Sequence, residues 1–147
     1  MDVRIVEIKI KSESGKVPAY ETDGAAGMDI AACIQDDITL LPGKTAMIGT
    51  GLYIELPVGY EAQIRARSGL AAKHGIGLVN GIGTIDSDYR GEIKVILINW
   101  GEVPLVIKNG DRIAQMVICQ YERAKLVKVD KLSETARNQG GFGHTGV

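Results

Sequence analysis

The sequence is poor in the residues from which most metal sites and disulfides are built. It has two cysteines, Cys33 and Cys119, far apart in apolar runs, and two histidines, His74 and His144. Neither cysteine belongs to a C-x-x-C pair or has a histidine partner at metal-ligand spacing, which argues against a zinc site. We expect two buried free thiols and two histidines that face solvent or end a helix.

The chain also lacks an excess of either charge and any long hydrophobic run. A formal net charge of −1 over 147 residues provides no basic field for nucleic acid and no polybasic patch for a membrane. No stretch approaches the ~18 apolar residues of a membrane span, and the first ten residues lack the apolar core of a signal peptide. The sequence predicts a cytoplasmic protein that binds neither nucleic acid nor membrane.

Helical periodicity is scarce, whereas short apolar or alternating segments recur between turn residues. This pattern predicts an all-β sandwich or barrel, and the length favours one domain. One short helix is expected at residues 68–74, with Ser68 as its N-cap and Gly75 as its end. Strands are expected within residues 3–10, 28–33, 37–41, 45–56, 60–67, 77–85, 92–100, 104–121 and 125–132.

The segment 92–100 is apolar on both faces if it forms a strand. Ile93, Val95 and Leu97 share one face, and Ile96 and Ile98 share the other. A strand of this kind must be covered on both sides. Two interpretations remain open, a contact between subunits and a core strand enclosed within one domain.

The most informative stretch, residues 77–100, resembles a hairpin that carries polar groups on an apolar frame. Gly81 and Gly83 allow backbone to approach a ligand closely, and Asp86, Asp88 and Tyr89 follow. The stretch could hold a flat ligand by backbone hydrogen bonds and act on it by acid or base. Aspartates that merely form a turn are the alternative. A calcium loop is rejected because its twelfth position is not Glu, and a dinucleotide site because no helix follows.

Two further segments suggest contacts with a negatively charged ligand. Arg65 and Arg67 precede Ser68 and the expected helix, which favours an anion site or, equally, an ordinary helix start with solvated arginines. The Gly-rich residues 137–147 contain the only phenylalanine, Phe142, together with Arg137. We interpret them as an aromatic lid, with a disordered terminus as the alternative.

Five segments in order resemble the trimeric dUTPase family over essentially the whole chain. They are AGMDI (26–30), RSGLA (67–71), NGIGTIDSDYRGEI (80–93), GDRIAQMV (110–117) and RNQGGFGHTG (137–146). The resemblance implies a jelly-roll-like distorted barrel (1–136), a flexible arm (137–147) that closes over the site, and a homotrimer with shared active sites. It also implies Mg²⁺-assisted hydrolysis of dUTP to dUMP and pyrophosphate, which limits uracil incorporation into DNA and supplies dUMP for thymidylate synthesis.

The resemblance also implies roles for single residues. Asp86 is similar to the residue that orients and deprotonates the attacking water, and Tyr89 to the ring that packs under deoxyribose. Asp29 is similar to a carboxylate near the water shell of a Mg²⁺ ion held mainly by substrate phosphates. The uracil-binding hairpin would comprise Asn80, Gly83, Thr84, Ile85, Asp86 and Lys94. The phosphate contacts would comprise Arg67, Ser68, Gly69, Gln115 (which also neighbours the water), Arg137 and Gly143, with Phe142 stacked on uracil.

Two arm positions depart from the family pattern. Asn138 replaces the usual Gly after the arginine, and His144 replaces the usual Ser after the Phe-Gly pair. Asn tolerates left-handed dihedrals, whereas the change at residue 144 removes a hydroxyl that would touch phosphate, although an imidazole could still donate there. Two other interpretations of the chain are a dCTP deaminase of the same superfamily and a non-catalytic nucleotide-binding trimer.

Overall fold

The computed structural model describes residues 3–146, which form eleven short strands and one helix. All strand pairs among these residues are antiparallel. The prediction of an all-β protein with one short helix is confirmed. The elements are β1 (Lys9–Ser12), β2 (Gly27–Ala31), β3 (Ile38–Leu40), β4 (Thr45–Gly49), β5 (Leu52–Glu55), β6 (Tyr60–Arg65), α1 (Ser68–His74), β7 (Ile76–Leu78), β8 (Gly83–Ile85), β9 (Lys94–Asn99), β10 (Leu105–Ile107) and β11 (Arg112–Gln120).

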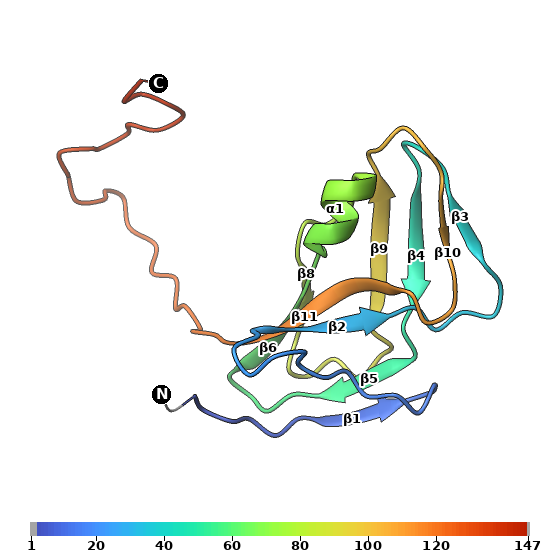
Figure 1. The fold of residues 1–147 in the computed structure, drawn as a ribbon. Coiled ribbons are helices and arrows are strands. Elements are labelled where there is room, and N and C mark those ends of the chain that lie inside the picture. The colour runs from blue at the N-terminus through green and yellow to red at the C-terminus, as the bar shows by residue number, and fades with distance from the viewer. Residues whose placement is uncertain (1–2, 147) are drawn as a thin grey trace.

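The strands form four small sheets around one core (Figure 1). Their orders are β2-β11-β6-β8, β4-β9-β7, β1-β5 and β10-β3, so neighbours in space are mostly distant in sequence. Each of the two larger sheets turns an aliphatic face inward, which removes most of its apolar surface from water. The most deeply buried large aliphatic side chains are Ile30, Leu40, Ile48, Ile76, Ile93, Val95, Leu97 and Ile107.

Three of the expected strands are each divided into two by a short break. The breaks contain Gly51, Gly81 and Gly110, with φ of 65°, 70° and 88°. A side chain with a Cβ rarely adopts this left-handed region. Periodicity therefore located the apolar segments correctly, and the glycines mark where each segment leaves one sheet and enters another.

Two strand predictions are wrong in whole or in part. The amino-terminal strand begins only at Lys9, and no strand forms at 125–132. Leu126 and Val127 are 93% and 71% exposed, and Figure 1 shows the chain running away from the sheets after β11. An alternating pattern predicts a face that must be covered, but no strand of this copy pairs with the segment.

The helix prediction is correct in position but wrong at its first residue. Arg67 has the extended N-cap dihedrals, φ −89° and ψ 131°, whereas Ser68 already lies inside α1, and no side chain caps the helix. Gly75 ends the helix as predicted, in the left-handed conformation with φ of 68°. Serine is common at N-caps, but the turn of backbone occurs one residue earlier.

Several other predictions are resolved by burial. Cys33 and Cys119 are free, as expected, but only half-buried, so the expectation that both are buried is wrong. His74 and His144 are exposed, as expected. On β9, Ile96 and Ile98 are only partly buried in this single copy. No helix within the described residues is long and apolar enough to cross a membrane.

Candidate active site

A cleft of about 280 Å³ opens where β8, the following turn and the start of β9 meet β4 and β6. All the residues predicted for the uracil-binding hairpin line it, together with Tyr89. Three further lining residues, Met47, Ile64 and Glu92, were not predicted as site residues, although Glu92 belongs to the segment 80–93 that carried part of the resemblance. The full lining is Met47, Ile64, Asn80, Gly83, Thr84, Ile85, Asp86, Tyr89, Glu92 and Lys94.

The expected hairpin forms at its base but opens in the middle. β7 and β9 pair, with Leu78 opposite Leu97, whereas β8 leaves them and pairs with β6 through Gly83 opposite Ile64. A Cβ at Gly83 would approach the Cβ of Ile64 to 3.2 Å. The missing side chain therefore lets β8 lie close against β6 and leaves the cleft open beside it.

Asp86 and Tyr89 lie in the turn after β8, and both are exposed at the cleft. The backbone carbonyl of Asp86 accepts a hydrogen bond from the amide of Tyr89 at 3.1 Å. The Tyr89 hydroxyl donates to the backbone carbonyl of Glu92 at 2.8 Å. Asp88 does not line the cleft, so a single carboxylate of the aspartate pair faces it.

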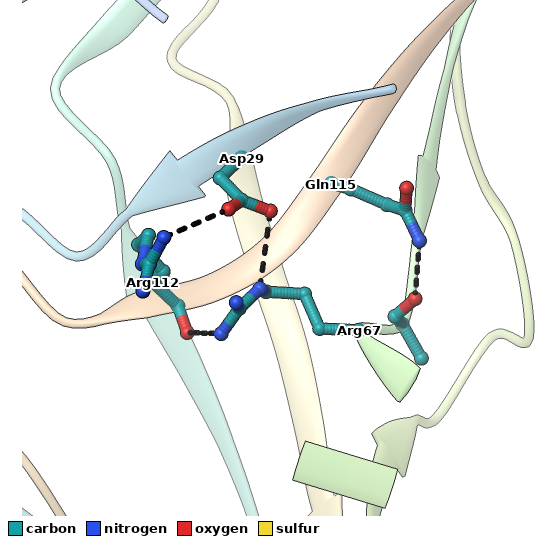
Figure 2. A network of polar contacts seen from close by, with 5 residues as sticks. Asp29, Arg67, Arg112 and Gln115 are labelled. Atoms are coloured by element: carbon teal, nitrogen blue, oxygen red, sulfur yellow. Dashed lines mark hydrogen bonds and ion pairs between the residues drawn. The ribbon is translucent and has the colours of Figure 1, made fainter. Parts of the chain in front are cut away.

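A second group of predicted residues forms a polar cluster around Asp29 on β2 (Figure 2). Asp29 accepts hydrogen bonds from Arg67 Nε at 3.1 Å and from Arg112 Nη1 at 3.3 Å. Arg67 also donates to the backbone carbonyl of Arg112 at 3.1 Å. The carboxylate thus orients two guanidinium groups, both within reach of solvent. Arg112 was not predicted as a site residue, although its segment carried part of the resemblance.

Gln115 on β11 and the start of α1 complete this cluster. The Gln115 amide donates to the backbone carbonyl of Ala66 at 2.9 Å, as Figure 2 shows. Ser68 and Gly69 are exposed in the first turn of α1. Arg65 turns to Gln63, and its Nε donates a hydrogen bond to Gln63 Oε1 at 3.1 Å. Arg67, rather than both arginines, therefore belongs to the cluster.

The cleft and the cluster lie at different strands of the four-stranded sheet and share no residue. Across the ladders, Asp29, Gln115 and Arg65 are paired neighbours, so their side chains share one face. Thr84, which lines the cleft, pairs with Gln63 of β6, two residues from Arg65, and therefore belongs to that same face. The opposite face is buried in the core, so the two groups are separated along the sheet, from β2 and β11 to β8.

The arm residues lie apart from both groups. Residues 122–139 are all exposed, and Phe142 is fully exposed on a turn with φ of 51°. Arg137 Nε donates to the carbonyl of Gly140 at 2.8 Å, and Gly143 has φ of 82°. Asn138 adopts φ of 47°, which matches the tolerance expected of Asn where the family pattern has Gly.

The described residues offer no metal cage of their own. No group of three or more His, Cys, Asp or Glu side chains comes together in residues 3–146. Asp29 already accepts from two arginines, which suits a carboxylate that contacts a metal through water rather than directly. A small hard cation that keeps several waters and binds substrate phosphates fits such a site better than one that needs an all-protein cage.

Comparison with known proteins gives a consistent result. The dUTPase family model matches residues 13–146. A deoxyuridine 5'-triphosphate nucleotidohydrolase of Caldanaerobacter subterraneus subsp. tengcongensis is 56% identical over 97% of this chain and 99% of its own. A Staphylococcus bacteriophage 80alpha dUTPase solved with dUpNHpp is 25% identical, with a TM-score of 0.86 over 96% of this chain and 99% of that one. A phage phi11 dUTPase variant described with a structural Mg(II) ion shares the fold at 23% identity, with a TM-score of 0.75 over 87% of this chain and 99% of that one.

Proposed function

The chain belongs to the dUTPase family, and on that premise we propose that it hydrolyses dUTP to dUMP and pyrophosphate by attack of water on the α-phosphorus. The observation that carries the proposal is the cleft in which Asp86, Tyr89 and the backbone of β8 meet. Backbone amides, one carboxylate and one aromatic ring are the groups needed to hold a flat base and sugar and to direct water at a phosphate. The reaction would limit uracil in DNA and supply dUMP.

Base and sugar selection are assigned to the walls of the cleft. Backbone groups of β8 that match the carbonyl and N3–H of uracil leave unpaired groups against cytosine, a mismatch that can reject by about 10⁴–10⁵. Thymine is refused by steric conflict between its 5-methyl group and the close approach of β8 to β6. Tyr89, whose ring lines the cleft, is assigned the role of filling the space that the 2′-hydroxyl of a ribonucleotide would need.

Hydrolysis needs water placed in line with the leaving pyrophosphate and charge stabilisation on the phosphates. Asp86 is exposed at the cleft and orients and deprotonates that water. Arg67, Ser68, Gly69 and Gln115 bind the phosphates, and Gln115 also contacts the water. Mg²⁺ would supply charge neutralisation on the phosphate chain, with Asp29 reaching its water shell.

We infer a homotrimer in which each site combines the cleft of one copy with the cluster of another, since the two groups share no residue within one copy. The partly buried Ile96 and Ile98 and the 61% exposed Met47 on the neighbouring strand provide apolar surface for such a contact. The arm, residues 137–147, closes over this composite site. Arg137 and Gly143 then contact phosphate, and Phe142 stacks on uracil.

The Asp86→Asn variant tests the proposal, and the Asp88→Asn variant is its matched control. Purified wild-type protein with dUTP and Mg²⁺ should release pyrophosphate and no orthophosphate. Asp86→Asn should reduce kcat by about 10² or more, the usual value of a positioned general base, with little change in the affinity for the imido analogue dUpNHpp. Asp88→Asn removes an acid that does not line the cleft and should retain activity. Release of orthophosphate alone, or equal losses in the two variants, would refute the mechanism.

A further inference from the structure

We propose that Gly91 is a positioning residue for sugar selection, because only a residue without a Cβ leaves room for the Tyr89 ring to close the deoxyribose end of the cleft. The inference rests on the proposed function and deepens it. Gly91 itself does not line the cleft. It acts through Tyr89, whose ring does.

The requirement at residue 91 is for space and not for an unusual backbone. Gly91 is absent from the glycines with positive φ, so alanine could adopt its conformation. A Cβ at this position, however, would stand 2.5 Å from Cζ and 2.9 Å from Cε1 of Tyr89, and closer still to its hydroxyl oxygen. Such contacts lie far inside van der Waals distance, so the ring or the backbone must move.

The backbone beneath the ring is held too firmly to yield. The carbonyl of Glu92, which accepts the Tyr89 hydroxyl, is followed by the fully buried Ile93. Ile93 donates its amide to the carbonyl of Leu52 at 2.8 Å. The Glu92 carboxylate accepts from the amide of Gly51 at 3.2 Å. Residues 92–93 are therefore anchored to the first residue of β5 and to the glycine before it.

The other end of the turn is anchored by Arg90. Its Nη1 donates to the carbonyls of Ser87 and Tyr89 at 2.7 and 3.1 Å. Its Nη2 pairs with Glu55 on β5 at 3.4 Å. The turn therefore holds the Tyr89 ring in one place, over Gly91 and with its hydroxyl hydrogen-bonded to the carbonyl of Glu92. With 43% of Tyr89 exposed, the side chain has room to rotate outward when that place is filled.

A Gly91→Ala substitution should swing the ring out and open space beside the sugar C2′. The expected result is a fall of about tenfold or more in the ratio of kcat/KM for dUTP to kcat/KM for UTP, since displacements near 1 Å can change rates by about 10². The ratio is insensitive to the fraction of folded protein, which cancels between the two substrates. A purely structural role for Gly91 would leave it unchanged.

A double-mutant cycle shows whether the effect passes through Tyr89. Tyr89→Ala alone should lower the dUTP/UTP ratio, and adding Gly91→Ala to it should change the ratio no further. Gly24→Ala is the matched control, because a Cβ there meets nothing within 4 Å and its φ is not positive. It should leave both rates unchanged. An unaltered ratio in Gly91→Ala, or effects of the two substitutions that simply multiply, would overturn the proposal.

The inference and the proposed function can fail separately. If wild-type protein releases no pyrophosphate from dUTP, the proposed function is wrong. Ligand-free crystal structures of wild type and Gly91→Ala then decide the positioning claim. Displacement of the Tyr89 hydroxyl from the Glu92 carbonyl in the variant supports it, and an unmoved ring refutes it.

Discussion

At the scale of single residues, the glycines around the site act mainly by the volume that they leave empty. Gly27 on β2 is a second case beside Gly91. A Cβ there would lie 3.3 Å from Cδ of Gln115 and closer still to its Oε1. Gln115 Oε1 lies over this gap while the Nε2 of the same amide donates to the carbonyl of Ala66. The glycine of the AGMDI segment therefore lets a catalytic candidate from another strand take its place.

Gly27→Ala should displace the Gln115 amide and reduce kcat for dUTP by about tenfold or more, because the phosphate and water contacts depend on sub-ångström placement. The affinity for dUpNHpp should change less. Steady-state kinetics with a thermal melt would check this, with Gly24→Ala as the control. If kcat is unchanged, or if the loss matches the unfolded fraction seen in the melt, Gly27 does not position Gln115.

The chemical types of the site residues were predictable from sequence, whereas their contacts were not. An aspartate, a tyrosine and two glycines in a short apolar frame indicated the cleft. The pairing of Asp29 with Arg112 joins residues 83 positions apart in sequence, and no local pattern reports such a contact. The helix start at Arg67 rather than Ser68 likewise depends on backbone geometry that a preference for serine cannot decide.

At the scale of elements, the strands that pair within one copy were located and the segment without a partner was misassigned. Residues 125–132 have the alternation of a strand but form none. Periodicity reports that one face of a segment is apolar. It does not say which chain covers that face. Residues 133–136 connect this segment to the arm.

Removal of residues 136–147 should separate catalysis from folding. The described part of this segment is almost entirely exposed and forms no strand, so its loss should change the melting temperature little. Turnover of dUTP should fall by about 10² or more, because a closing lid excludes water and completes the phosphate contacts. Full activity of the truncated protein would exclude the lid. A lowered melting temperature would indicate a structural role instead.

At the scale of the whole molecule, the separation of the two groups along the sheet β2-β11-β6-β8 leaves the proposed site in two parts within one copy. The cluster of Asp29, Arg67 and Gln115 lies around β2 and β11, and the cleft with Asp86 and Tyr89 lies at β8 and the turn after it. The proposed homotrimer would join them, with the cluster of one copy beside the cleft of a neighbour.

Subunit mixing tests the shared site directly. Asp86→Asn and Arg67→Ala should each be nearly inactive alone, because each removes one half of every site. After unfolding and refolding together at equal concentration, random trimers should recover about a quarter of wild-type activity, the fraction of sites that join an intact cleft to an intact cluster. Each variant refolded alone is the control, and size-exclusion chromatography with light scattering reports the oligomer. If both halves of a site came from one chain, every site in the mixture would carry one of the two substitutions. The mixture would then stay inactive however well it assembled.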